Sequence, residues 1–219
     1  MELDLCKQAI ASNPDDYEAY YHLGKIFAKQ QKWHKAIVAY EKVIELQGDF
    51  AEVYHDYGDA LVNLKRWRKA VIAYEQSIAL KPDFSWSYHN LGTVFFKTKR
   101  IPKAINYYSQ ALAIDQNNPQ FNYSLGQAFN YQKSWSKAAI YYQNAIDLGL
   151  DEWQIYHEYG DILLNLESYD KAISNYKKAI ELNESSAWSY HNLGVALFNL
   201  ALFTESVTFF EQAIAIDAN

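Results

Sequence analysis

The chain has 219 residues, a formal net charge of −6 and 50% hydrophobic residues, so it can bury a large core. Its single cysteine, Cys6, excludes an intrachain disulfide and any multi-cysteine metal site. No apolar run approaches the roughly 18–20 residues of a membrane span, and residues 1–10 lack the pattern of a signal peptide, so we expect a cytoplasmic protein without a membrane span.

Charge is unevenly distributed along the chain. Residues 1–118 carry 15 Lys and Arg against 14 Asp and Glu, whereas residues 119–219 carry 5 against 12. A strongly acidic second half repels the phosphate backbone of nucleic acids, so the sequence predicts no nucleic-acid partner.

Residues 1–16 have the pattern of the end of a helix, with Ala9 and Ile10 at its apolar positions and Pro14 after it. From Tyr17 onward three columns of residues recur every 34 positions: a glycine, a small residue twelve positions later and an aromatic residue four beyond that. The glycines are Gly24, Gly58, Gly92, Gly126, Gly160 and Gly194; the small residues are Ala36, Ala70, Ala104, Ala138, Ala172 and Ser206; the aromatics are Tyr40, Tyr74, Tyr108, Tyr142, Tyr176 and Phe210.

Each 34-residue period predicts two amphipathic helices, as in residues 17–30 and 33–46, because apolar residues recur at helical spacing. A glycine inside a helix costs about 1 kcal/mol relative to alanine. We expect it to lie against the small residue of the second helix, where two backbones approach closely. One helix pair cannot bury its apolar faces alone, so the pairs must stack.

These columns resemble the tetratricopeptide repeat over nearly the whole chain. The resemblance implies an all-α fold, a right-handed α-solenoid (superhelix) of antiparallel helix pairs, after an N-terminal half repeat or capping helix at 1–16. The six predicted repeats are 17–50, 51–84, 85–118, 119–152, 153–186 and 187–219. The string WSYHNLG occurs at 86–92 and again 102 residues later at 188–194, so repeats 1–3 and 4–6 are expected to be a duplicated block.

The resemblance also implies that the first helix of each repeat lines a concave groove that binds a peptide or partner protein. Two equivalent sets of side chains would face it: His55, Asp59, Trp86, His89, Asn90 and Phe96, and then His157, Asp161, Trp188, His191, Asn192 and Phe198. Exposed aromatics are typical anchors of interfaces. By the resemblance the asparagines hold peptide main chain, and the aspartates favour Lys or Arg in the ligand. The alternative is that Trp86 and Trp188 pack on the neighbouring first helix.

Four histidines share one column, at His55, His89, His157 and His191. A metal ion needs ligand nitrogens about 2.0–2.1 Å away, and no third ligand is evident, so we expect no metal and no cofactor. Hydrogen bonds within the groove, or a modest pH sensitivity of binding, fit these side chains better.

Two further surfaces, the basic turns of the first half and the exposed side of the last helix, each allow two interpretations. Basic turns at Lys65–Lys69 and Lys97–Arg100 are expected to be solvated, with an acidic partner or an anionic membrane as the alternative. The last helix would turn Phe210 and Ile214 toward water, which predicts that a longer protein continues here or that another copy covers this end.

The residues contain no Gly-rich phosphate loop, no HExxH and no GxSxG motif, so we expect no enzyme activity. The predicted function is a non-catalytic protein-interaction scaffold. The alternatives are the substrate-recognition arm of a larger enzyme, such as a glycosyltransferase, and a self-assembling structural module.

Overall fold

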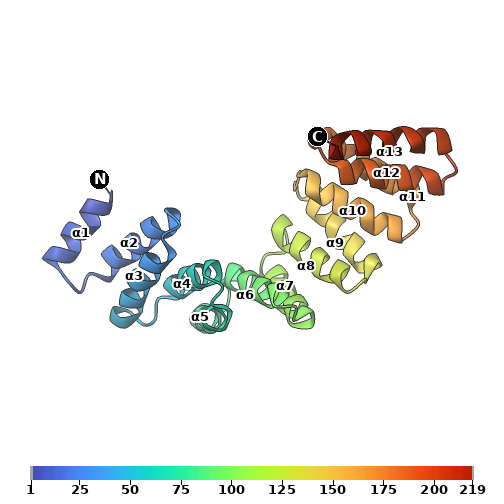
Figure 1. Ribbon diagram of the computed structural model, residues 1–219. Helices are drawn as coiled ribbons and strands as arrows, with labels where there is room; N and C mark the ends of the chain where they lie inside the picture. The colour runs from blue at the N-terminus through green and yellow to red at the C-terminus, as the bar shows by residue number, and fades with distance from the viewer. Residues whose placement is uncertain (1, 219) are drawn as a thin grey trace. The chain divides into compact units, whose positions relative to one another are not determined.

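The computed structural model describes residues 2–218, which form thirteen α-helices and no strand. Met1 and Asn219, at the outer ends of the predicted half repeat and sixth repeat, lie outside the described residues. The helices (Figure 1) are α1 (Glu2–Ser12), α2 (Tyr17–Lys29), α3 (Trp33–Leu46), α4 (Ala51–Asn63), α5 (Trp67–Leu80), α6 (Ser85–Lys97), α7 (Ile101–Ile114), α8 (Pro119–Tyr131), α9 (Trp135–Asp147), α10 (Trp153–Asn165), α11 (Tyr169–Leu182), α12 (Ala187–Asn199) and α13 (Phe203–Asp217). No helix of this described range is long and apolar enough to cross a membrane.

The helices pack in the order of the chain. α2 packs on α3, α4 on α5, α6 on α7, α8 on α9, α10 on α11 and α12 on α13. Between successive pairs, α3 packs on α4, α5 on α6, α9 on α10 and α11 on α12. The predicted all-α fold, a solenoid of antiparallel helix pairs, is therefore confirmed.

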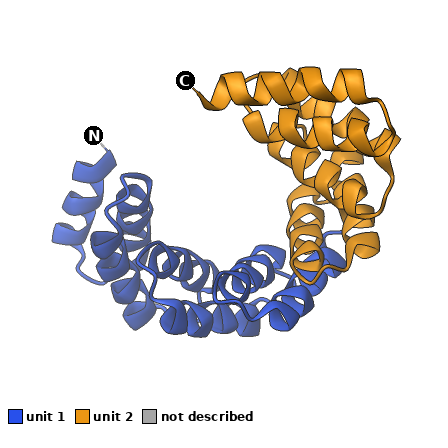
Figure 2. Cartoon of the chain, turned by 45° about the vertical axis from the view of Figure 1, so that its right-hand side comes forward, with its two compact units in different colours: residues 1–116 blue, residues 117–219 orange. Residues whose placement is uncertain are grey.

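The chain divides into two compact units, residues 1–116 and 117–219, called here the N-terminal and C-terminal units (Figure 2). The N-terminal unit carries 15 basic and 14 acidic residues, and the C-terminal unit carries 5 and 12. The charge asymmetry of the sequence is therefore a difference between the two units.

The repeated glycines make room for aromatic rings. A Cβ atom added at Gly58 would lie 2.6 Å from Cε1 of Tyr74, and one added at Gly92 would lie 2.7 Å from Cδ1 of Tyr108. Both distances are far below van der Waals contact. The ring four residues beyond the small residue fills the space beside the glycine. Tyr74 is 1% exposed as a result. The expected small residue also lies against the glycine in the sixth repeat, where Oγ of Ser206 donates to the carbonyl of Gly194 (2.8 Å).

The turn between the two helices of every repeat contains one residue with positive φ, between 55° and 62°: Gln31, Lys65, Lys99, Lys133, Glu167 and Ala201. At Lys65 the turn is closed by two backbone bonds, from its own N–H to the carbonyl of Val62 (2.9 Å) and from the N–H of Arg66 to the carbonyl of Leu61 (2.8 Å). These bonds satisfy carbonyls that a helix end leaves without a partner. The left-handed conformation is thus built into each repeat without a glycine.

Candidate functional site

A pocket of about 420 Å³ opens on the N-terminal unit, where α2, α4 and α6 lie beside one another. Three aromatic side chains from the second helices, Trp33, Tyr40 and Tyr74, form part of its wall, and Asp56 and Asp59 of α4 supply carboxylates. The remaining lining residues are Lys25, Ala28, Val62, Asn63, Asn90 and Thr93. Aromatic walls with two acids suit a cationic group more than an apolar one.

Asp59 joins three helices in this pocket. Its Oδ1 accepts hydrogen bonds from the hydroxyl of Tyr74 (2.6 Å) and from Nδ2 of Asn90 (2.8 Å). Burial raises the pKa of the Tyr74 hydroxyl above its ordinary value, and the neighbouring Asp59 carboxylate raises it further, so the hydroxyl stays a donor. The side-chain amide of Asn90, which the sequence analysis expected to hold the main chain of a peptide, therefore donates to Asp59.

His55 of α4 lies between the same carboxylate and a pair of serines. Its Nδ1 is 3.0 Å from Oγ of Ser87, and its Nε2 is 3.6 Å from Oδ2 of Asp59. Ser87 in turn lies 2.8 Å from Oγ of Ser77 on α5. These contacts order the imidazole within the fold, with its two nitrogens facing different partners.

Asp56 differs from Asp59 in having an unused oxygen. Tyr21 of α2 donates to its Oδ2 (2.8 Å), and none of the described residues donates to its Oδ1. Burial raises the pKa of the Asp56 carboxyl, and the hydrogen bond from Tyr21 opposes this only in part. Asp56 is therefore the pocket carboxylate with acceptor capacity left for a ligand.

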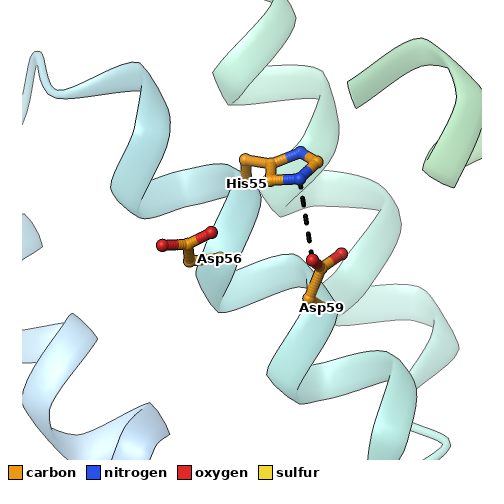
Figure 3. A group of neighbouring side chains, drawn as sticks. All are labelled: His55, Asp56 and Asp59. Carbon is orange, nitrogen blue, oxygen red and sulfur yellow. Dashed lines mark ion pairs between the residues drawn. The ribbon is translucent and has the colours of Figure 1, made fainter. Parts of the chain in front are cut away.

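Ligand atoms of His55, Asp56 and Asp59 lie within 4.8 Å of one another (Figure 3). Figure 3 shows the imidazole of His55 above the Asp59 carboxylate, with Asp56 one turn away on the same helix. Each of the three already contacts a protein partner, Ser87, Tyr21 or Tyr74. These bonds account for the cluster without an ion, and the expected lack of a metal site stays a prediction.

The C-terminal unit repeats most of this network. Oδ1 of Asp161 accepts from the hydroxyl of Tyr176 (2.7 Å) and from Nδ2 of Asn192 (2.7 Å). His157 places Nδ1 2.9 Å from Oγ of Ser189 and Nε2 3.5 Å from Oδ2 of Asp161. The identity between the two halves of the sequence therefore includes buried polar contacts.

The units differ at the position of Asp56, which is Glu158 in the second half. Oε2 of Glu158 accepts from three side chains, Tyr123 (3.1 Å), Gln127 (3.3 Å) and Tyr142 (2.5 Å). The equivalent acid thus holds three donors of its own unit, all on one oxygen, whereas Asp56 holds one.

The predicted aromatic anchors of the N-terminal unit lie outside the pocket lining. Trp86 is 42% exposed, and its ring meets that of His89 edge-on with centroids 5.4 Å apart. His89 is only 7% exposed, which corrects the prediction that it lines a groove. Burial also lowers the pKa of His89, so it stays neutral. Phe96 is half-buried on α6.

In the C-terminal unit the equivalent residues are more open. Trp188 is 74% exposed and, with His191, Phe210 and Ile214, it lines a hollow of about 380 Å³. Phe198 is 56% exposed, and its ring packs edge-on against Phe203 at 5.2 Å. This hollow lies at the end of the last helix pair, where Ile214 is 69% exposed.

The basic turns are exposed, as expected for solvated turns. Residues 65–69 surround an open hollow of about 520 Å³. In the next turn, Cζ of Arg100 lies 4.9 Å from the ring centroid of Phe95 and Nζ of Lys103 lies 5.3 Å from it. Part of this charge therefore stabilises its own repeat through cation–π contact.

The sequence interpretation missed the second-helix residues Trp33, Tyr40 and Tyr74 in the pocket wall. A signal for Tyr74 was present: the aromatic column is tyrosine in five repeats and phenylalanine only at Phe210. In that sixth repeat the position of Asp59 is held by Val195, which offers no acceptor. The hydroxyl and its acceptor are lost together, as expected for a buried hydrogen bond.

Comparison with protein families identified repeats over most of the chain. Tetratricopeptide repeat models match residues 17–50, 51–84 and 186–216, and a further TPR repeat model matches 94–133 and 160–200. A protein prenyltransferase alpha subunit repeat model matches residues 1–30. The search of curated proteins gave no match.

Solved structures of tetratricopeptide proteins share the fold. YrrB, described as a TPR protein with an unusual peptide-binding site, is 22% identical and superimposes with a TM-score of 0.77, over 83% of this chain and 93% of YrrB. A MamA structure is 23% identical with a TM-score of 0.73, over 78% of this chain and 94% of MamA. Pseudomonas aeruginosa pilF is 21% identical with a TM-score of 0.76, over 84% of each chain.

Proposed function

Because the chain belongs to the tetratricopeptide repeat family, we propose that it is a non-catalytic, cytoplasmic interaction scaffold whose N-terminal unit binds an arginine side chain of a partner peptide. Stacked helical repeats present extended surfaces of this kind. The observation that carries the proposal is the pocket between α2, α4 and α6, with the half-used carboxylate of Asp56 beside three aromatic rings.

Arginine fits this pocket better than other side chains do. Its planar guanidinium can stack on the partly exposed ring of Trp33 while its N–H groups donate to Oδ1 of Asp56. Lysine offers a compact, strongly hydrated charge that stacks less well. An acidic side chain in this pocket would be repelled by the carboxylates of Asp56 and Asp59, so we expect no binding of peptides that place Asp or Glu there.

The pKa of Asp56 predicts how binding depends on pH. Burial raises this pKa, so the carboxyl takes up a proton at a higher pH than an exposed aspartate does. A guanidinium binds only the ionised form. Affinity is therefore expected to fall as the pH is lowered through the pKa of Asp56.

The test uses fluorescence anisotropy with labelled, acetylated and amidated hexapeptides of Ala and Ser around one central residue. Central arginine is compared with citrulline, which has nearly the same shape without charge, and with glutamate. We expect binding by the arginine peptides only, weakened about tenfold, or about 1.4 kcal/mol, by Asp56→Asn. Glu158→Gln is the matched control, since Glu158 holds the equivalent position outside the pocket and already accepts from three side chains of its own unit. Equal binding of the citrulline peptides, or equal loss from both variants, would contradict the proposal.

A further inference from the structure

The last helix, α13, presents an apolar stripe to solvent. Phe203, Val207, Phe210 and Ile214 follow at i, i+4, i+7 and i+11, which places them on one face. Phe203 is 55%, Val207 54% and Ile214 69% exposed. Three large apolar side chains on one exposed face form a contiguous patch, which is typical of an interaction surface.

The earlier repeats of the same unit show which element packs on the equivalent stripe of a second helix. The residues equivalent to Val207 and Ile214 are Ala139 and Ile146 on α9, and Ile173 and Ile180 on α11. All four pack against the core of the C-terminal unit, where α10 follows α9 and α12 follows α11. The stripe of a second helix therefore packs against the first helix of the next repeat, whereas among the described residues α13 packs on α12 of its own repeat.

A complementary face is open in the first repeat. Leu23 and Phe27 of α2 are only partly buried, whereas Leu91 and Leu193, equivalent to Leu23, are 0% exposed. With Tyr20 and Val38 they line an open hollow of about 700 Å³. This is the face on which a preceding second helix would pack.

The short helix α1 covers part of that face with a sequence that α13 repeats. α1 packs on α2, yet none of its side chains is fully buried. Its residues 8–11 read QAIA, and so do residues 212–215 of α13, 204 positions or six repeat lengths later. α13 has 15 residues against 11 in α1, and the residues that it adds at its N-terminal end include Phe203.

From these observations we propose that α13 of one copy docks on the α2–α3 face of a second copy, in the position that α1 occupies within its own chain, so that copies associate end to end. Charge supports this pairing. Residues 187–218 carry no Lys or Arg and three acids, and residues 17–46 carry five Lys and three Glu. α1 is tethered to the face it covers and competes with the incoming helix, which keeps association weak in the unmodified chain.

The test measures mass by light scattering over a wide range of concentrations. Wild-type mass should rise with concentration, and Ile214→Asp should abolish the rise. Ile10→Asp changes the equivalent residue of α1 and should act in the opposite direction, lowering the concentration of half-association several-fold because it releases the competitor. Thr208→Asp, which puts the same charge on α13 outside the stripe, should leave association unchanged. A wild type that is monomeric throughout, or an Ile10→Asp variant that associates no better than wild type, overturns the proposal.

A variant that should strengthen association is also needed, because a variant that weakens it could do so simply by failing to fold. Repeats 2 and 5 have tyrosine where repeat 1 has Leu23, and those hydroxyls donate to the preceding second helix, Tyr57 to Glu41 (2.9 Å) and Tyr159 to Gln143 (3.2 Å). The residue of α13 equivalent to Glu41 and Gln143 is Glu211. Leu23→Tyr should therefore strengthen association about three- to tenfold, and Glu211→Ala should cancel the gain. Unchanged association of Leu23→Tyr would place α13 elsewhere and refute the docking position.

Discussion

Replacing Asp59 tests whether the buried network of the N-terminal unit is a single energetic unit. Asp59→Ala removes the acceptor of two donors, the Tyr74 hydroxyl and the Asn90 amide. Tyr74→Phe removes one donor and leaves the carboxylate with Asn90. The double variant removes both ends of the Tyr74–Asp59 bond.

The magnitudes follow from burial. A buried donor left without an acceptor costs about 1–3 kcal/mol. Tyr74 is 1% exposed, so Asp59→Ala should cost about 2–3 kcal/mol. In Tyr74→Phe the Asp59 carboxylate, whose side chain is 42% exposed, can bind water instead, so we expect about 1–1.5 kcal/mol. The double variant should lose no more than Asp59→Ala alone, which gives a coupling energy of about 1 kcal/mol or more.

Native-state hydrogen exchange of α4 to α6 is the assay, because repeat arrays open locally and a global midpoint averages over both units. Asp161→Ala with Tyr176→Phe forms the same cycle in the C-terminal unit and serves as the matched control. Its effect should be confined to α10 to α12. Additive single variants, with coupling below about 0.5 kcal/mol, would refute the reasoning.

Three further variants test the packing, the turns and the buried histidine. Gly92→Ala should destabilise α6 and α7 by about 1–3 kcal/mol by urea unfolding, despite the better helix propensity of alanine, because its Cβ would meet the ring of Tyr108; a stabilised variant would contradict the role of the glycine. Ala201→Gly should stabilise the sixth repeat by about 0.5–1 kcal/mol, since it relieves a positive φ of 59°, and an unchanged thermal midpoint would count against this. Burial lowers the folded-state pKa of His89, so the unfolded chain binds its proton first, and stability should fall as the pH drops below about 6.5, by at most about 1.4 kcal/mol per pH unit. His89→Gln should reduce this acid sensitivity, whereas His191→Gln, at an exposed position, should not; equal pH profiles for wild type and His89→Gln would be evidence against the argument.

The helices could be predicted from the period alone, because a stacked pair needs the same apolar positions in every repeat. The period also identified the close contact at Gly58 but not the ring that fills the space beside it. Gly58 faces the ring of Tyr74, which a one-dimensional pattern cannot distinguish from the nearby Ala70. Only the three-dimensional pairing of the helices decides between them.

The site was harder to predict for a similar reason. The prediction assigned Asp59 and Asn90 separately to a ligand, yet they bind each other and Tyr74 across three helices. Asp56 was distinguishable from Glu158 only through the donors that surround each acid. Hydrogen bonds between different positions of a repeat, and between one repeat and the next, determine which polar groups are still able to bind a partner.

The proposed arginine pocket is tested most directly by the indole N–H signals of the six tryptophans in a ¹H–¹⁵N spectrum. Trp33 lines the pocket, and Trp135 holds the equivalent position in the C-terminal unit. On titration with the arginine hexapeptides, the account predicts a saturable shift of the Trp33 signal, absent in Asp56→Asn, with Trp135 unmoved. Shifts of Trp86 or Trp188 with Trp33 unmoved, or equal shifts of Trp33 and Trp135, would contradict it.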